Sequence, residues 1–277
     1  MDKINVDAWV GREAREHCQI TEIQAQKIHA TIGEGRAPRA GEPLPPTWHW
    51  CAFTPSADNA ALGRDGHVRG SSFLPPVYLP RRMWAGGNLT FHRALHVGEQ
   101  MERTSRIRSL VEKEGKTGPM VFLTLDHLIY GETGLAIEET QDIVYLDIPE
   151  TFTPPAKQSV PAKTAETVET PETLLFRYSA ITFNAHRIHY DLRYTQEVER
   201  YPGLVVHGPL QASLLMRAAI RQKGRAPLFF SFRGVHPMFA GDPCEIASQE
   251  DSEGLALWSG QNGHQCMQAR AMWEETQ

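Results

Sequence analysis

The chain has 277 residues, enough for one large domain or for two of ordinary size. Hydrophobic residues make up 41% of it and charged residues 22%, so a buried core can form without support from disulfides or metals. The net charge is −5 and no run of five basic residues occurs, which argues against binding to nucleic acid. No apolar stretch approaches the roughly 20 residues that span a bilayer. Composition therefore predicts a globular protein outside the membrane.

The amino-terminal residues mix acidic and basic side chains without an apolar segment, so we expect no secretory signal there. The cysteines show no C-x-x-C spacing and are Cys18, Cys51, Cys244 and Cys266. We therefore expect free thiols, a reducing compartment and a cytoplasmic location.

A capping box of Thr21 and Gln24 predicts the start of a helix. The apolar residues on one face of this helix are Ala25, Ile28 and Ile32. Prolines then interrupt residues 33–50, which we expect to form a long extended loop. Residues 102–115, 118–134 and 135–147 follow as β-rich runs joined by short glycine-containing turns. Such turns predict antiparallel neighbours.

Residues 149–173 concentrate proline, threonine, lysine and glutamate and contain almost no large apolar residue. This composition is typical of a linker, so we expect it to contribute nothing to a core. The expected division is an amino-terminal domain at 1–148, the linker, and a carboxy-terminal domain at 174–277.

The second half has the same style as the first. We expect a strand at 176–182 and a helix beginning near Pro209, with further strands at 227–235, 243–250, 255–261 and 264–273. The apolar face of the helix consists of Leu210, Leu214, Leu215, Ala218 and Ala219. A glycine followed by an acid opens the strand block in each half, at Gly98 and at Gly241, which suggests an internal duplication. The predicted fold class is α+β, and a hotdog if each sheet wraps around a helix.

Three histidines, His186, His189 and His207, fall close together in the second half. Nearby histidines are most often structural, and H-x-x-H without an added ligand is weak evidence for a metal site. Acid–base catalysis is the third reading, because histidine titrates near neutrality. Gly208-Pro209 opens the predicted helix, so the Gly208 N–H would be an unpaired donor at the positive end of the helix dipole.

Two segments resemble the hydratase motif of MaoC-like enzymes, residues 182–191 (TFNAHRIHYD) and 201–210 (YPGLVVHGPL). More closely, they resemble the type 2 hydroxyacyl-thioester dehydratases and the bacterial mesaconyl-C4-CoA and itaconyl-CoA hydratases. The segments of the first half that agree are 62–67 (LGRDGH), 73–76 (FLPP), 79–87 (LPRRMWAGG) and 141–145 (QDIVY). The resemblance covers nearly the whole chain except the linker.

This resemblance implies a double hotdog in which the first half is non-catalytic and shapes the acyl pocket, while the second half carries the catalytic residues. The broader MaoC pattern is Asp-x-Asn-Pro-aliphatic-His. Here Asn184, His186 and Arg187 stand at the Asp, Asn and Pro positions, and Ile188 and His189 are retained.

An amide cannot take a proton, so Asn184 is expected only to orient water or the thioester. His189 would remove a proton from water and return it to the α-carbon on the same face, and the Gly208 N–H would hold the enolate oxygen. We do not expect Asp191 to face the site.

The expected reaction is reversible syn hydration of an α,β-unsaturated acyl-CoA. The resemblance implies a branched C5 dicarboxylic acyl group, with itaconyl-CoA or mesaconyl-C4-CoA converted to citramalyl-CoA in itaconate degradation. A second carboxylate would need a cation such as arginine. Expected substrate-binding residues are Arg187, Tyr201, His207, Arg81, Arg82 and Trp84. No metal and no cofactor besides the CoA thioester is implied, and a homodimer is expected.

Two alternatives stay open. A 3-hydroxyacyl dehydratase of the fatty-acid type, acting on chains carried by CoA or acyl carrier protein, would share every catalytic residue. A non-catalytic thioester-binding hotdog module would use the fold as a scaffold.

Overall fold

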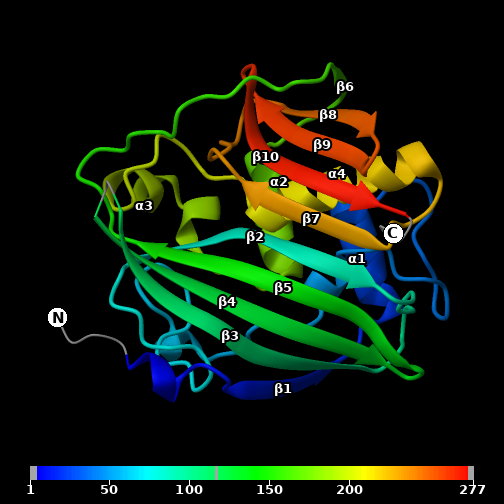
Figure 1. Ribbon diagram of the computed structural model, residues 1–277, viewed down its shortest axis with the longest axis horizontal. Helices are drawn as coiled ribbons and strands as arrows, with labels where there is room; N and C mark the ends of the chain where they lie inside the picture. Colours follow the sequence, from blue (N-terminus) through cyan, green and yellow to red (C-terminus); the bar gives the residue numbers. More distant parts are fainter. Residues whose placement is uncertain (1–4, 116–117, 274–277) are drawn as a thin grey trace.

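A ten-stranded antiparallel sheet runs through the molecule, and helices lie on one side of it (Figure 1). The computed structural model describes residues 5–115 and 118–273. The first-half strands are β1 (Glu13–Cys18), β2 (Arg81–Phe91), β3 (Met101–Gly115), β4 (Gly118–Gly131) and β5 (Gly134–Leu146). Those of the second half are β6 (Thr164–Val168), β7 (Phe229–Gly234), β8 (Cys244–Asp251), β9 (Gly254–Gln261) and β10 (His264–Met272). The helices are α1 (Glu22–Ile32), α2 (Glu172–Ile181), α3 (Leu192–Glu197) and α4 (Gly208–Lys223). In the described part of the chain, no helix is both long and apolar enough to cross a membrane.

The strand order has an internal symmetry. From one edge to the other it is β1-β3-β4-β5-β2-β7-β10-β9-β8-β6, so each half consists of an edge strand, a three-stranded meander and a strand at the joint that is connected to the meander by a crossover. Gly98 and Gly241 lie in the equivalent turns before β3 and β8, with φ values of +87° and +102° that favour glycine. The predicted α+β class and the predicted repeat of helix and meander agree with this arrangement.

The two halves meet where β2 pairs with β7, from Gly86 opposite Arg233 to Thr90 opposite Phe229. One hydrophobic core extends across this joint, because Leu89 and Phe230 are fully buried in the same cluster. The halves therefore share one hydrophobic core and are not separately packed domains.

The two predicted helices form as expected. The capping box of α1 is present, and its three predicted apolar residues are buried. Helix α4 begins at Gly208, one residue before the predicted start, and all five predicted apolar residues of its face are buried. Both helices are held by the apolar face that they turn toward the sheet.

The strand expected at 176–182 is wrong, because this segment lies mostly in helix α2. Leu175, Tyr178 and Ser179 are buried at helical spacing. The β-branched and aromatic residues that suggested a strand are local preferences, which burial of one helix face overrides.

The expected linker at 149–173 is wrong in part, because strand β6 lies within it and pairs with β8. Strand β6 is at the sheet edge and is mostly exposed, so it needs few apolar residues and resembles a linker in composition. Strands β1 and β2 were not predicted as strands. Strand β2 contains Gly86 and Gly87 and an irregularity in its pairing with β5, which obscure the alternation of a strand.

We predict that Gly86→Ala weakens the joint between the halves. A methyl group at Gly86 would lie 2.6 Å from the backbone oxygen of Phe232 on β7, so the strands would have to separate. The free energy of unfolding should fall by about 1–3 kcal/mol in urea titrations. Asn88→Ala, at an exposed position of the same strand, is the control and should change it by less than about 0.5 kcal/mol. Equal stability of the two variants would contradict the prediction.

Candidate active site

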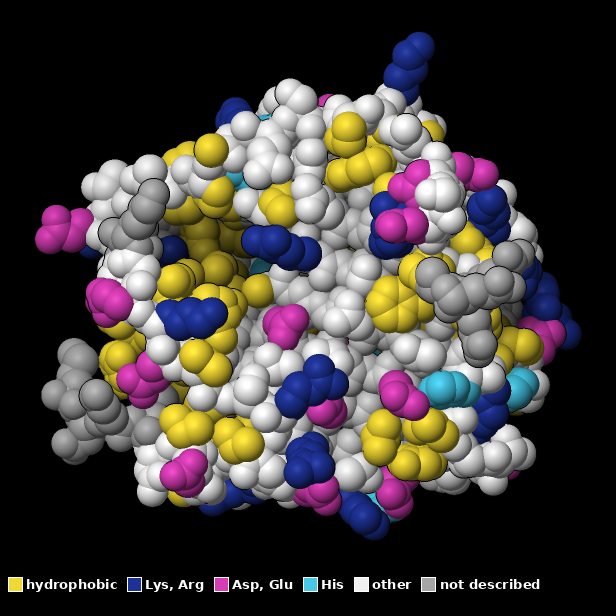
Figure 2. Space-filling model, viewed as in Figure 1, with side chains coloured by type: hydrophobic (Ala, Val, Ile, Leu, Met, Phe, Trp, Pro, Cys, Tyr) yellow, Lys and Arg dark blue, Asp and Glu magenta, His cyan; other side chains and the backbone are white. Residues whose placement is uncertain are grey.

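A large cavity lies between the two halves, with a volume of about 1790 Å³. It is lined by strands of the first half, by the loop residues 53–74 and by the segment between α2 and α4. Figure 2 shows a hollow lined mainly by hydrophobic side chains, with Lys or Arg side chains at its rim. Eight of the nine predicted site residues line the cavity, and Arg187 does not.

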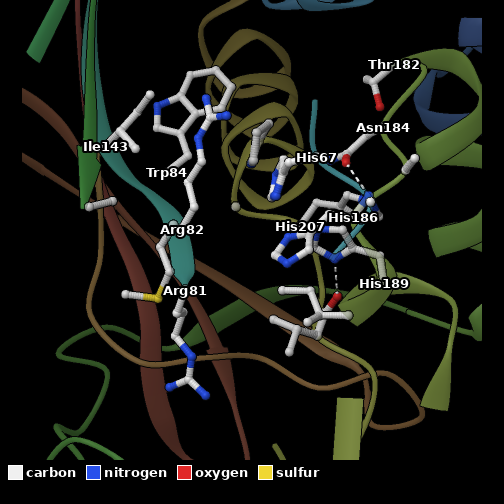
Figure 3. A pocket seen from close by; sticks show the side chains of 18 of the residues that line it. His67, Arg81, Arg82, Trp84, Ile143, Thr182, Asn184, His186, His189 and His207 are labelled. Atoms are coloured by element: carbon white, nitrogen blue, oxygen red, sulfur yellow. Dashed lines mark hydrogen bonds between the residues drawn. The ribbon is translucent and has the colours of Figure 1, made fainter. Parts of the chain in front are cut away.

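The catalytic segment, residues 182–189, connects the end of α2 to a single 3₁₀ turn, Arg187–His189. The Asn184 backbone N–H donates to the Ser179 carbonyl at 2.8 Å, and the Asn184 side-chain oxygen accepts from the His186 N–H at 2.9 Å. Phe183 adopts a left-handed conformation, with φ of 48°. These contacts fold the segment back on itself, so that Asn184 and His189 line one cavity (Figure 3).

The His189 ring is fixed by its surroundings. Its Nδ1 lies 2.7 Å from the carbonyl oxygen of Val205. A carbonyl can only accept, so Nδ1 carries the proton and Nε2 is left with a lone pair. Burial, reinforced by neighbouring His207 and His186, lowers the pKa of His189 well below its usual value. The ring is therefore a neutral base at neutral pH.

His207 lies against His189 as a stacked ring, with centroids 3.6 Å apart and planes 18° apart. Its Nε2 lies 2.9 Å from the Ser179 hydroxyl, and burial lowers its pKa to about 3. His207 is also the N-cap of α4, so Gly208 is the first residue of this helix. No acceptor for the Gly208 N–H is found in the described part of the chain. This N–H lies at the positive end of the α4 dipole, and Gly208 lines the cavity.

A loop of the first half, residues 62–68, contacts the catalytic segment. The Arg187 N–H donates to the Asp65 carbonyl at 2.9 Å. A Cβ at Gly66 would collide with the Ala185 carbonyl oxygen. The loop brings His67 into the cavity, with its ring 4.2 Å from that of His186. The family resemblance includes residues 62–67 of this loop, but no local sequence pattern predicts a role for it. Proximity to a segment about 120 residues away along the chain leaves no such pattern.

Arg81 is held by a buried ion pair. Its Nε lies 3.0 Å from an oxygen of Glu199, whose other oxygen lies 3.6 Å from His186 Nε2. Burial opposes ionisation of Glu199, but His186 and Arg81 outweigh it and keep the Glu199 pKa below its usual value. The Arg81 guanidinium also lies over the Tyr201 ring at 4.4 Å. Arg81 and Tyr201 thus line the cavity, and Arg81 is held in place by its contacts with Glu199 and with the Tyr201 ring.

Arg82 differs from its neighbour. Figure 3 shows that Arg81 and Arg82 point in opposite directions from β2. Within residues 5–115 and 118–273, Arg82 makes no ion pair, and its one ring contact is with Tyr145 at 6.0 Å. Its charge contributes to lowering the pKa of His67, after burial and His186. Arg82 is therefore a permanent cation on the wall of the cavity with no anion of its own.

Arg187 is engaged elsewhere. Its Nη2 lies 2.6 Å from an Asp191 oxygen, and its guanidinium lies over Tyr194 at 4.2 Å. The structure gives no support to the expected role of Arg187 in substrate binding. Asp191 caps helix α3 and does not line the cavity, in agreement with its exclusion from the site.

Trp84 and a polar row complete the cavity. Trp84 donates its indole N–H to the Gly86 carbonyl at 2.9 Å. The polar side chains that line the first-half end are Arg103, Ser105, His127, Glu139 and Gln141. Glu139 is buried and accepts bonds from the Trp50 indole and the His49 ring at 2.9 and 3.0 Å. The first-half end of the cavity is therefore not a purely apolar tunnel.

Two groups of described side chains have ligand atoms spaced closely enough to hold a metal ion. They are Asp65, His67 and His186, and His236, His264 and Cys266. In the first group, His67 Nδ1 is already bonded to Asp65 at 2.8 Å. In the second, burial raises the pKa of the Cys266 thiol to about 12, which disfavours the thiolate that binds metals.

Comparisons with known proteins identify the family. The profile of hydroxyacyl-thioester dehydratase type 2 matches residues 47–240. Mesaconyl-C(4)-CoA hydratase of Chloroflexus aurantiacus is 42% identical over 255 residues, which cover 90% of this chain and 91% of that protein. The mitochondrial hydroxyacyl-thioester dehydratase type 2 of Schizosaccharomyces pombe is 30% identical over 246 residues, covering 78% and 80%.

A solved structure confirms the fold. A conserved hypothetical protein of Mycobacterium tuberculosis, described as a double hotdog, matches with a TM-score of 0.57 at 13% identity, covering 96% of each chain. The expected double hotdog is thus confirmed. The chain belongs to the hydroxyacyl-thioester dehydratase type 2 family, the hydro-lyases that resemble MaoC-like enzymes.

Proposed function

We propose that this protein reversibly adds water to a branched C5 dicarboxylic enoyl-CoA, such as mesaconyl-C4-CoA, to form citramalyl-CoA. The observation that carries the proposal is His189, whose Nδ1 is held by the Val205 carbonyl so that Nε2 is a free base in a cavity. The identity of 42% to a mesaconyl-C(4)-CoA hydratase supports the choice of acyl group.

The proposed step needs a base and a site for negative charge. The water oxygen bonds to the β-carbon while His189 Nε2 takes one of its protons and then delivers that proton to the α-carbon on the same face. Negative charge collects on the thioester oxygen as the β-carbon is attacked. The Gly208 N–H, at the first turn of α4, would donate to this oxygen.

The acyl group is inferred from the polarity of the cavity. Arg82 is a cation that pairs with no anion among the described residues, and a carboxylate on the substrate would pair with it. Arg103, Glu139 and Gln141 make the first-half end of the cavity polar, so this end offers little apolar surface against which a long alkyl chain could be buried. These residues favour a short polar acyl group over the fatty-acid alternative.

We predict that His189→Gln abolishes hydration while the fold is kept. Glutamine fills a similar volume but cannot accept and return a proton, so kcat should fall by about 10²–10⁴. Loss of enoyl-thioester absorbance measures the rate, and thermal unfolding checks the fold. The exposed His17→Gln is the control and should keep full activity. Near wild-type kcat in His189→Gln would contradict the proposal and would leave the non-catalytic binding module as the better reading.

We predict that activity persists in mild acid. The base acts when unprotonated, and its lowered pKa means that it gains a proton only well below pH 6.5. The value of kcat/KM should therefore stay level as the pH falls from about 8 to about 6, and should fall only when the pH passes through the lowered pKa. A decline centred near pH 6.5, in a protein that remains folded, would argue against His189 as the base.

We predict that Arg82→Met changes the choice of acyl group. Loss of a charged hydrogen bond to the second carboxylate should lower kcat/KM for mesaconyl-C4-CoA by about 10- to 100-fold. Crotonyl-CoA, which has no second carboxylate, should be affected by less than about threefold. Arg193→Met, at an exposed arginine paired with Glu197, is the matched control. An equal loss with both thioesters would exclude Arg82 as the determinant.

A further inference from the structure

The 62–68 loop is built into the active site from the first half. Leu62 and Val68 pair as an isolated bridge at its base, which closes the loop. The loop is joined to the catalytic segment by two hydrogen bonds from Arg187, from its backbone N–H to Asp65 and from its guanidinium to the Arg64 carbonyl at 3.1 Å. Gly66 allows the close approach, since any side chain there would collide with Ala185. The loop and the segment therefore behave as one unit.

Within this loop, Asp65 fixes the His67 side chain. One Asp65 oxygen accepts from the His67 backbone N–H at 3.1 Å, and the other lies 2.8 Å from His67 Nδ1. A carboxylate partner places the proton on Nδ1, so Nε2 keeps its lone pair. No partner for Nε2 is found among the described residues, and the ring lines the cavity next to His186 (Figure 3).

The attacking water must be oriented by two hydrogen-bond acceptors. Water has two O–H groups, and both need acceptors if its own lone pair is to be aimed at the β-carbon. His189 Nε2 is one acceptor. Asn184 has less capacity left for this, because its oxygen already uses one of its two lone pairs on the His186 N–H and its nitrogen can only donate.

We propose that His67 Nε2 is the second acceptor for the attacking water and that Asp65 is its positioning residue. This inference rests on the proposed hydration. The water oxygen bonds to the β-carbon, the proton facing His189 passes to Nε2 and on to the α-carbon, and the hydrogen facing His67 stays on the new hydroxyl group. The first half thus contributes a catalytic residue and does more than shape the pocket.

A role for His67 in binding the second carboxylate is less consistent with its surroundings. Burial outweighs the effect of Asp65 and lowers the His67 pKa to about 4, so the ring is neutral at pH 7. A neutral ring with its lone pair directed outward repels a carboxylate and attracts an O–H donor. Arg82, which is always charged, suits the carboxylate better.

The test measures His67→Gln, Asp65→Asn and the double variant with mesaconyl-C4-CoA and with crotonyl-CoA. For His67→Gln we expect kcat to fall about 10- to 100-fold with both thioesters, with little change in KM, because water is misplaced while the thioester still binds. In Asp65→Asn the amide can donate to Nδ1 and favour the wrong tautomer, so a similar loss is expected. The double variant should be no worse than the poorer single variant, because both act on one water.

Controls separate this role from a structural one. Thermal midpoints of the variants should stay close to the wild type, and His17→Gln should retain full activity. Asp65→Asn leaves the His67 ring in place, so it provides the test if His67→Gln does not fold. A fall in kcat at unchanged KM and unchanged midpoint is not expected from a loss of packing.

Three results would overturn the inference. The first is a kcat of His67→Gln within about threefold of wild type. The second is a loss of activity confined to mesaconyl-C4-CoA, which would make His67 a carboxylate ligand. The third is activity that a chelator removes and zinc restores, which would make Asp65, His67 and His186 a metal site. If His67→Gln is active while His189→Gln is inactive, this inference is refuted but the proposed function is not. A wild type that turns over neither thioester refutes the proposed function together with it.

Discussion

The pairing of β2 with β7 is the interaction on which the rest of the structure depends. It joins the strands of the two halves into one sheet and lets a single core extend through both halves. The approach is close because Gly86 has no Cβ, which would lie 2.6 Å from the Phe232 carbonyl oxygen of β7. Once the halves are paired in this register, the 62–68 loop meets the catalytic segment, and residues of both halves line the cavity between them.

The site divides its tasks between backbone and side chains. In the proposed mechanism, backbone groups hold the reacting parts: the Val205 carbonyl orients His189, and the start of α4 would present the Gly208 N–H. Substitution by any residue except proline keeps such groups, and the fold fixes their positions before the reaction. In the proposed function, side chains would supply selectivity, through Arg82 and the polar row of the first half. The same fold can thus accept a different acyl group while the proposed reaction stays the same.

Sequence patterns identified the elements whose burial is periodic. The helices α1 and α4 and the long strands β3 to β5 have clear apolar spacing and were predicted close to their observed bounds. The failures have physical causes. The segment at 176–182 has strand-like residues but docks as a helix, and β6 resembles a linker because an edge strand buries little.

The sequence by itself determined that a hydratase-like histidine and a helix amino terminus follow each other in the second half, because both belong to one local motif. The sequence could not indicate which arginine would bind a substrate carboxylate, since every arginine carries the same charge. Only the tertiary structure separated Arg81 and Arg187, which are paired with carboxylates, from Arg82, which has no carboxylate partner in the described ranges 5–115 and 118–273. It also brought Asp65 and His67 to the catalytic segment. Such contacts depend on how the two halves pack, and no spacing along the chain encodes them.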